Sequence, residues 1–114
     1  MSDCIFCKII EGSIPSVNVY RDEQVTAFRD VNPAAPTHIL IVPNKHIDSV
    51  NTLTNADEQL IGRLFMAAQQ LAAQEGVAEN GYRLIVNTGA DAGQTVFHVH
   101  LHLLGGKPIK HLIG

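Results

Sequence analysis

The chain has 114 residues, enough for one domain with a single hydrophobic core. Hydrophobic residues make up 46% and charged residues 17%, a balance that predicts a folded chain and excludes a disordered one. The formal net charge of -3 gives no general attraction for nucleic acid, so we expect any phosphate to be bound by local geometry. Composition leaves one feature unexplained, the 6 histidines.

The sequence lacks recognisable targeting and membrane signals, which bears on where in the cell the protein is located. The N-terminal sequence has no basic segment followed by an apolar one, so we expect no signal peptide. The apolar runs fall short of the roughly 20 residues that cross a bilayer, and neither end has a lipidation motif. We therefore expect a cytoplasmic protein with no membrane and no nucleic-acid partner. In that compartment Cys4 and Cys7 are expected to be thiols or metal ligands and not a structural disulfide.

The first part of the chain predicts a short helix followed by strands. The helix covers residues 3–10, with Asp3 as its N-cap and Gly12 ending it. Three strand-like stretches follow, rich in β-branched or aromatic residues and bounded by turn residues. These are residues 17–20, 25–29 and 38–42.

One long helix is predicted over residues 55–75. Thr54 and Asp57 fit a capping box at its start, and Gly76 is placed to cap its end. Apolar residues recur in it at helical spacing and predict one buried stripe. The stripe consists of Leu60, Ile61, Leu64, Phe65, Ala68, Leu71 and Ala72.

Two further strands, at 82–87 and 96–104, complete the predicted elements. Short links between several strands favour an antiparallel sheet with the long helix packed on one face. We therefore expect residues 1–114 to form a single α+β domain. It would contain a five-stranded, mainly antiparallel sheet, one long helix and a short N-terminal helix.

The last predicted strand alternates between histidine and apolar residues. In a strand, His98, His100 and His102 share one face, and the apolar residues face the long helix. The apolar set is Phe97, Val99, Leu101 and Leu103. The outer histidines would lie about 13 Å apart, too far to share one ion without strain. Three structural histidines remain possible, but a row with separate catalytic roles is favoured, because neutral imidazole is nucleophilic and its cation donates protons.

A loop rich in small residues precedes the histidines. It contains Gly89, Gly93, Gln94 and Thr95. Such a loop can direct backbone N–H groups at an anion, although an ordinary turn has the same composition. It is not a P-loop, because the GxxxxGK[ST] pattern is absent from the sequence.

The segment 98–104 resembles the HφHφHφφ motif of the histidine triad (HIT) superfamily, in which φ is an apolar residue. Further matches lie at Asn87, 93–95 and 104–106. Segments 5–10, 27–30 and 35–43 look like the branch called histidine triad nucleotide-binding proteins. The resemblance covers about residues 3–108. It implies a HIT-like α+β fold and a homodimer whose sheets join across the two-fold axis.

The resemblance also implies a purine nucleoside phosphoramidase, which hydrolyses the P–N bond of adenosine or guanosine 5′-monophosphoramidates and releases AMP or GMP. By position, His100 would be the nucleophile and would form a nucleotidyl-histidine. His102 and Thr95 would contact the phosphate, and His38 would orient His100. His98 would complete the catalytic set, and the chemistry would need no cofactor. The alternatives are a dinucleoside polyphosphate hydrolase and a non-catalytic nucleotide-binding regulatory protein.

By the same resemblance, a nucleotide site is expected. Asp30 would accept both ribose hydroxyls, and Asn87 would donate near the phosphate beside Gly93 and Gln94. Four apolar side chains would enclose the base, although plain core positions are an equal alternative for them. These are Ile5, Phe6, Ile9 and Val31.

Cys4 and Cys7 form an isolated CxxC pair. On a helix, positions i and i+3 share a face, so both thiolates could bind one ion. Tetrahedral zinc needs two more ligands, and His46 and His98 are the best candidates, by similarity to zinc sites in some bacterial relatives. In that case His98 would be structural. Two thiols without metal and a redox pair are the alternatives.

Overall fold

Five strands form one antiparallel sheet in the computed structural model, which describes residues 3–110. The strands are β1 (Asn18–Arg21), β2 (Val25–Arg29), β3 (Thr37–Pro43), β4 (Tyr82–Ile85) and β5 (Leu101–Gly105). They pair in the order β1-β2-β3-β5-β4, and each neighbouring pair is antiparallel. The predicted α+β class and sheet are confirmed. The predicted domain span of 1–114 includes end residues outside the described range.

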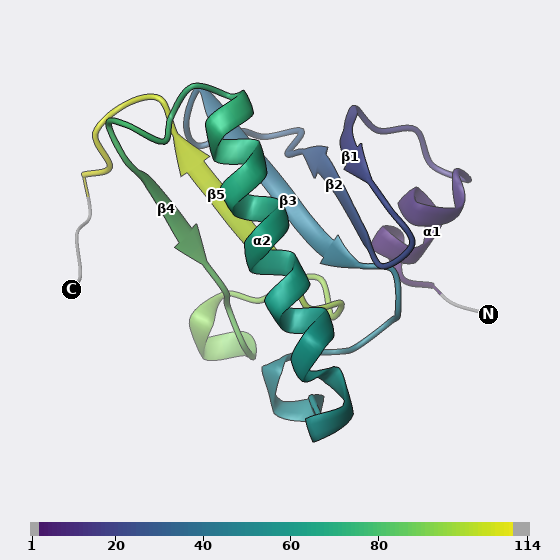
Figure 1. The fold of residues 1–114 in the computed structure, drawn as a ribbon. Helices are drawn as coiled ribbons and strands as arrows, with labels where there is room; N and C mark the ends of the chain where they lie inside the picture. The colour runs from purple at the N-terminus through teal and green to yellow at the C-terminus, as the bar shows by residue number, and fades with distance from the viewer. Residues whose placement is uncertain (1–2, 111–114) are drawn as a thin grey trace.

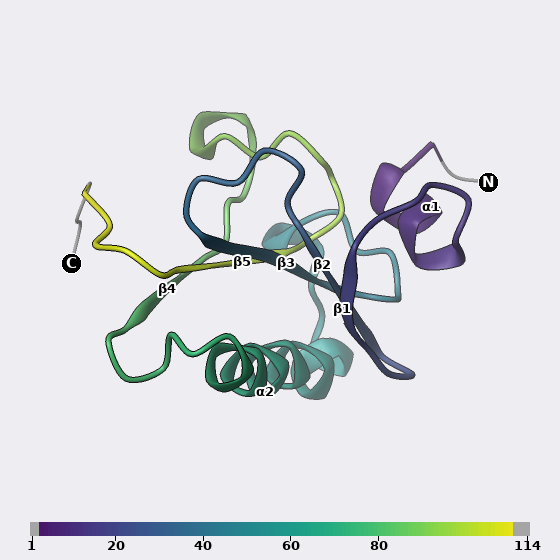
Figure 2. The same cartoon turned by 90° about the horizontal axis from the view of Figure 1, so that it is seen from above.

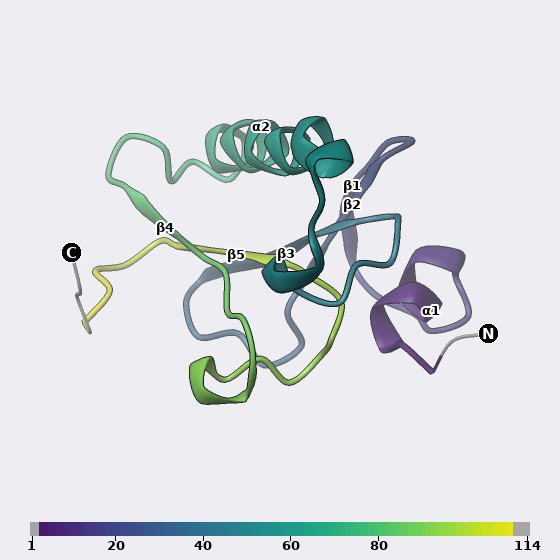
Figure 3. The ribbon, with the colours of Figure 1, turned by 90° about the horizontal axis from the view of Figure 1, so that it is seen from below.

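Two α-helices lie on opposite sides of this sheet. The long helix α2 (Glu58–Gln74) crosses one face of it (Figure 1), and Figure 3 shows the same layering from below. The short helix α1 (Ile5–Glu11) lies on the other side, beside β1, as do the loops that precede β3 and β5 (Figure 2). Within the described residues, no helix is long and apolar enough to span a membrane.

Alternation along the strands sends side chains to two separate cores. On β3, Ile39 and Ile41 pack in the core beneath α2, whereas Leu40 and Val42 join a second core with α1. On β5, Leu101 and Leu103 belong to the α2 core, as the sequence predicts. The intervening positions of both strands therefore face α1, which places His38 and His102 on that side.

The buried face of α2 is close to the predicted apolar stripe but is rotated about the helix axis. Phe65 was expected to be buried and is 47% exposed, while Ala67 is fully buried. The buried positions of α2 are Leu64, Ala67, Ala68, Leu71 and Ala72. Three of these five are alanines, whose small side chains let the helix axis approach the sheet closely, so the bulkier Phe65 stays at the margin.

The ends of both helices correct or confirm particular predictions. The N-cap of α1 is Cys4 and not Asp3, because the Cys4 sulfur accepts the backbone N–H of Cys7 at 3.4 Å. The capping box before α2 is present, with the Thr54 N–H donating to Asp57 Oδ2 at 2.9 Å. A single 3-10 turn, Asn55–Asp57, comes first, so α2 begins later than predicted.

The predicted strand 96–104 is the main error in the elements. Only Leu101–Gly105 is strand, and the residues before it form a loop. Both neighbours of β5 stop pairing here, since Ile41 is opposite Leu101 and Ile85 is opposite His102. The loop is held instead by the Val99 N–H, which donates to the Ile47 carbonyl at 2.7 Å. As a result His98 leaves the sheet, and Phe97 is 51% exposed.

Candidate active site

A cavity of about 360 Å³ opens between α1, the sheet and the loop after β2. Eight of the residues predicted for catalysis or nucleotide binding line it. They are Ile5, Phe6, Ile9, Asp30, Val31, Thr95, His100 and His102. The predicted residues outside its lining are His38, Asn87, Gly93, Gln94 and His98. An apolar wall from α1 thus faces polar groups from three other segments, the arrangement expected of a small-molecule site.

Sequence reasoning missed several members of this lining, including Phe28 and Leu40. Both face α1 in the second core. The sequence held a signal for Leu40, because it lies two positions from His38 on one strand and therefore shares its face. Phe28 pairs directly with Leu40 across β2 and β3, which only the register reveals.

His100 has one ring nitrogen fixed by its own chain. Its Nδ1 lies 2.7 Å from the carbonyl oxygen of His98, and because a carbonyl can only accept, Nδ1 carries the proton. In the neutral ring the lone pair is then on Nε2. Burial lowers the pKa of His100 below its usual range. The ring is therefore neutral near pH 7, with Nε2 available as a nucleophile.

His38 contacts His102 and not His100, which corrects the predicted pairing. The backbone N–H of Ala34 donates to His38 Nδ1 at 3.0 Å, so the proton of neutral His38 is on Nε2. That Nε2 lies 3.0 Å from His102 Nδ1 and donates to it. The proton of His102 is thereby placed on its own Nε2. Leu40 pairs with His102 in the sheet, so His38 is a diagonal neighbour of His102 on one face.

Asp30 lies beside this pair. Its Oδ2 is 3.4 Å from His38 Nε2, and its Oδ1 accepts the N–H of Asn32 at 2.8 Å. Burial, together with repulsion from His100 and His38, lowers the pKa of His102 to about 4. Burial also lowers the pKa of His38, against the attraction of Asp30. Both rings are therefore uncharged near pH 7.

These shifts predict that the protein loses stability in mild acid. His102 has a pKa of about 4 when folded, against about 6.5 unfolded, so the unfolded state binds more protons between these values. The stability that His102 contributes is complete above about pH 6.5 and declines as the pH falls. We expect the free energy of unfolding to drop by about 1–2 kcal/mol between pH 7.5 and 5. Urea titrations at the two pH values measure this free energy. The drop should be smaller for His102→Gln, and an equal drop would contradict the lowered pKa of His102.

Gln94 holds the glycine loop and makes no contact with the cavity. Its side-chain oxygen accepts the N–H of Gly89 at 2.9 Å, and its amide donates to the carbonyls of Asp48 at 2.8 Å and Val96 at 3.1 Å. The side chain is buried, and these bonds use its donors and its acceptor. Gln94 therefore positions the loop, and Thr95 is the loop residue that reaches the cavity.

The two cysteines meet two histidines at the N-terminus of α1. Cys4 Sγ is 3.3 Å from His98 Nδ1, and Cys7 Sγ is 3.5 Å from the same atom. Cys7 Sγ is also 3.3 Å from His46 Nδ1. All four ligand atoms lie within 4.8 Å of one another. We call these four residues the Cys/His cluster.

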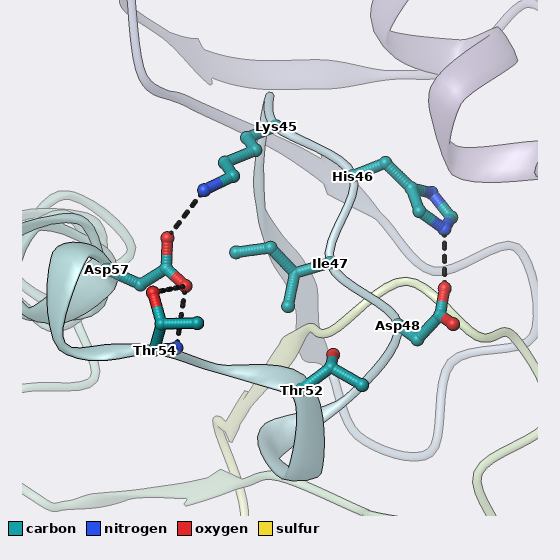
Figure 4. Close-up of a pocket in the computed structure, with 7 residues that line it drawn as sticks. All are labelled: Lys45, His46, Ile47, Asp48, Thr52, Thr54 and Asp57. Atoms are coloured by element: carbon teal, nitrogen blue, oxygen red, sulfur yellow. Dashed lines mark hydrogen bonds and ion pairs between the residues drawn. The ribbon is translucent and has the colours of Figure 1, made fainter.

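The cluster fits a tetrahedral zinc ion. Sulfur and nitrogen ligands at usual zinc bond lengths lie about 3.5 Å apart, close to the distances found. Each histidine donates its other ring N–H to an acceptor: His98 Nε2 to the Pro43 carbonyl at 2.8 Å, and His46 Nε2 to Asp48 at 2.7 Å. Figure 4 shows His46 turned toward Asp48. Such partners are typical of metal-binding histidines and leave each Nδ1 lone pair facing the sulfurs.

Phe6 connects the Cys/His cluster to the cavity. Its ring packs edge-on against His100, with centroids 5.0 Å apart, and against His98 at 6.0 Å. It also contacts Phe28 at 5.3 Å. The side chain is 6% exposed, so α1 is anchored at this point to both histidines.

Comparisons with known proteins agree with this arrangement. The family model described as HIT domain matches residues 11–109. The purine nucleoside phosphoramidase of Escherichia coli strain K12 is 55% identical over 111 residues, which are 97% of this chain and 93% of that protein. The structure of a HIT family hydrolase from Clostridium thermocellum has a TM-score of 0.95 and 48% identity, covering 99% of this chain and 98% of that one.

A histidine triad protein from Clostridium difficile is similar to the same degree. Its structure has a TM-score of 0.95 and 42% identity, and the match covers 99% of this chain and 98% of that one. The predicted HIT-like fold is thus confirmed by sequence and by structure. On this evidence the chain belongs to the HIT domain family.

Proposed function

We propose that this chain is a purine nucleoside phosphoramidase, which hydrolyses the P–N bond of adenosine or guanosine 5′-monophosphoramidates. One observation carries the proposal: His100, whose Nδ1 bond leaves the lone pair on Nε2, lines a cavity together with Asp30 and an apolar wall. The similarity to the Escherichia coli phosphoramidase over nearly the whole chain supports it. A binding protein would not need a nucleophile held in this way.

The reaction proceeds in two displacements at phosphorus. His100 Nε2 attacks the α-phosphorus, the P–N bond breaks, and the nitrogen takes a proton from solvent and leaves as the amine. The resulting nucleotidyl-histidine is cleaved by water, because a phosphorylated imidazole is a good leaving group. His102 directs its Nε2 proton at the phosphoryl oxygens, since His38 occupies its Nδ1. Product release as AMP or GMP restores neutral His100.

The remaining lining residues, with Asn87 from outside the lining, bind the nucleotide. Asp30 accepts the two ribose hydroxyls, for which a carboxylate has two oxygens. Thr95 contacts the phosphate with its hydroxyl, and Asn87 donates nearby. The base is enclosed by Ile5, Phe6, Ile9 and Val31. The high exposure of Val31, at 88%, suits a side chain that is covered only when the base is bound.

A comparison of substrates tests the function. We expect kcat/KM for adenosine 5′-phosphoramidate to exceed that for diadenosine tetraphosphate by at least about tenfold. Ion-exchange chromatography of the released AMP measures both reactions. Faster cleavage of the polyphosphate would favour the dinucleoside polyphosphate hydrolase, and AMP binding with no nucleotidylation would favour a regulatory protein.

We propose that the Cys/His cluster holds a structural zinc ion. Cys4, Cys7, His46 and His98 would be its ligands, and the metal would supply stability and no step of the hydrolysis. Lys45 donates to Asp57 at 2.7 Å, which fixes the segment that carries His46 to the start of α2 (Figure 4). The cluster therefore joins α1 to two separate loops.

Elemental analysis of the protein, purified without chelator, tests the metal. We expect about one zinc ion per chain, because the cluster supplies a complete tetrahedral ligand set. Cys7→Ser should reduce the zinc content strongly, whereas Met66→Leu, an exposed change on α2, should not. Trace metal far below one ion per chain would contradict the site.

We propose a homodimer as the functional unit, with a cytoplasmic location. β4 is an edge strand of the described sheet and presents unpaired backbone groups that a second copy can pair with. Phe65, Met66 and Val86 are exposed apolar side chains on α2 and just after β4. Their burial against a second copy would favour association.

A further inference from the structure

We propose that Cys4 and Cys7 form a reversible disulfide that weakens nucleotide binding, so that peroxide regulates this site. The proposal rests on the proposed function for its effect on AMP. The proposed hydrolysis itself uses neither of these two cysteines. Three features of the structure support it: the closeness of the sulfurs, an open approach, and the attachment of α1 to the cavity.

The two sulfurs are close and face the same atom. Both lie within 3.5 Å of His98 Nδ1, and all ligand atoms of the cluster are within 4.8 Å of one another. Cys4 is the N-cap of α1 and Cys7 is three residues later, so both side chains emerge on one side of the first turn. A bond between them therefore needs movement of side chains and of the helix start, not of the sheet.

Each sulfur has an imidazole nitrogen within hydrogen-bonding distance. His98 Nδ1 is 3.3 Å from Cys4 Sγ, and His46 Nδ1 is 3.3 Å from Cys7 Sγ. The Pro43 carbonyl and Asp48 fix the ring protons on the opposite nitrogens, so each Nδ1 lone pair faces a sulfur. These contacts hold both sulfurs on the same side of the first turn of α1.

An oxidant can reach Cys4. A cavity of about 430 Å³ lies against Cys4 and His46, and Phe97 and Asp48 are among its other lining residues. It adjoins the cavity that contains His100, and Ile5, Thr95 and Val96 line both. Both cysteines are half-buried, so a small molecule such as hydrogen peroxide has access without unfolding.

The oxidation is balanced with peroxide as the two-electron acceptor. The Cys4 sulfur attacks one peroxide oxygen, the O–O bond breaks, and a sulfenic acid and one water result. The Cys7 sulfur then attacks the Cys4 sulfur, the S–S bond forms, and the second oxygen leaves as water. Two thiols and one hydrogen peroxide give one disulfide and two waters, and the two thiol protons leave in the waters. A bound zinc ion would be released, since its two thiolates are lost.

The disulfide affects the nucleotide site through α1. The Cys4 sulfur no longer accepts the Cys7 N–H, and both sulfurs lose their contacts with His98 and His46. Phe6, between the two cysteines in sequence, packs against His100 and lines the nucleotide cavity. His98 also holds His100 through its carbonyl. A shift of the first turn therefore disturbs the base-binding wall and the nucleophile together.

Calorimetric titration of AMP into reduced and peroxide-treated protein tests the proposal. We expect the Kd for AMP to rise about tenfold on oxidation, a size typical when the groups that support a site are disturbed. Mass spectrometry should show the loss of two hydrogens, and dithiothreitol with added zinc should restore the affinity. Cys4→Ser with Cys7→Ser should show no change on peroxide treatment, whereas Met66→Leu, which lacks the exposed methionine, should respond as the unaltered protein does.

A second measurement separates this proposal from the proposed function. Hydrogen exchange of the α1 amides needs no nucleotide, and we expect it to accelerate in the disulfide form. If AMP fails to bind the reduced protein, the proposed function fails, and hydrogen exchange alone decides the switch. A disulfide that forms completely without changing the Kd or the exchange overturns the proposal. So does peroxide treatment that leaves the two sulfurs unjoined.

Discussion

Replacing His100 with alanine is expected to abolish phosphoramidate hydrolysis while AMP still binds. The reason is that the Nε2 atom of His100 forms the covalent bond to phosphorus, so no other group can complete the first displacement. Removal of a nucleophile typically lowers kcat by about 10⁴-fold or more. AMP binding depends on Asp30 and the apolar wall, which this change leaves in place. Steady-state kinetics and calorimetric titration of AMP measure the two effects separately.

His100→Asn is the matched variant for this experiment. Its amide NH₂ can occupy the place of Nδ1 and keep the bond to the His98 carbonyl, but it has no nucleophilic ring nitrogen. We expect it to bind AMP as the alanine variant does and to be equally inactive. Denaturing gel analysis after single turnover with labelled substrate should detect nucleotidylated protein only with His100 present. Turnover by either variant near the original rate would exclude this mechanism.

Several elements of the fold could be predicted, because each pattern depends only on residues that are close together in the sequence. The period-two pattern of Leu101 and Leu103 follows from burial on one face of a strand, and the structure confirms it. Gly76 also caps the end of the helix as predicted, with a positive φ of 76° and its N–H bonded to the Ala73 carbonyl. Such features need no knowledge of which strand is adjacent.

The errors at the site arise where distant segments meet. His38 was expected beside His100, but the register of β3 and β5 places it diagonal to His102. The partner of His100 is the backbone of His98, a contact that depends on the chain leaving the sheet before Leu101. Neither the register nor the end of pairing can be read from a histidine pattern, because both are set by where the neighbouring strands stop.

Residues whose side chains bond to other protein groups were the hardest to assign from sequence. His98 belongs to the triad motif, yet its ring faces two sulfurs and only its carbonyl reaches the nucleophile. Gln94 lies next to Thr95 in the loop, but its side-chain amide donates to backbone carbonyls. Residue type alone does not show which partners a buried polar group has, because such a group must first satisfy its own hydrogen bonds.

His102→Gln is expected to lower kcat about 10²–10³-fold, the usual cost of removing one donor to a developing oxyanion. His38 fixes the proton of His102 on Nε2, so the native ring presents a preorganised donor. Glutamine is shorter and lacks the ring that His38 orients, so its amide does not place a donor where Nε2 places one. The effect should appear in the nucleotidylation rate in single-turnover experiments, with a smaller change in the Kd for AMP.

His38→Leu provides the comparison, because it removes the orienting group and leaves the donor in place. We expect a smaller loss of kcat than with His102→Gln, since an unoriented His102 can still adopt the productive tautomer part of the time. The double variant should be no slower than His102→Gln alone, because His38 acts only through His102. Additive losses from the two changes would show that His38 acts on the phosphate or on His100 directly, and would contradict the tautomer assignment made from the Ala34 contact.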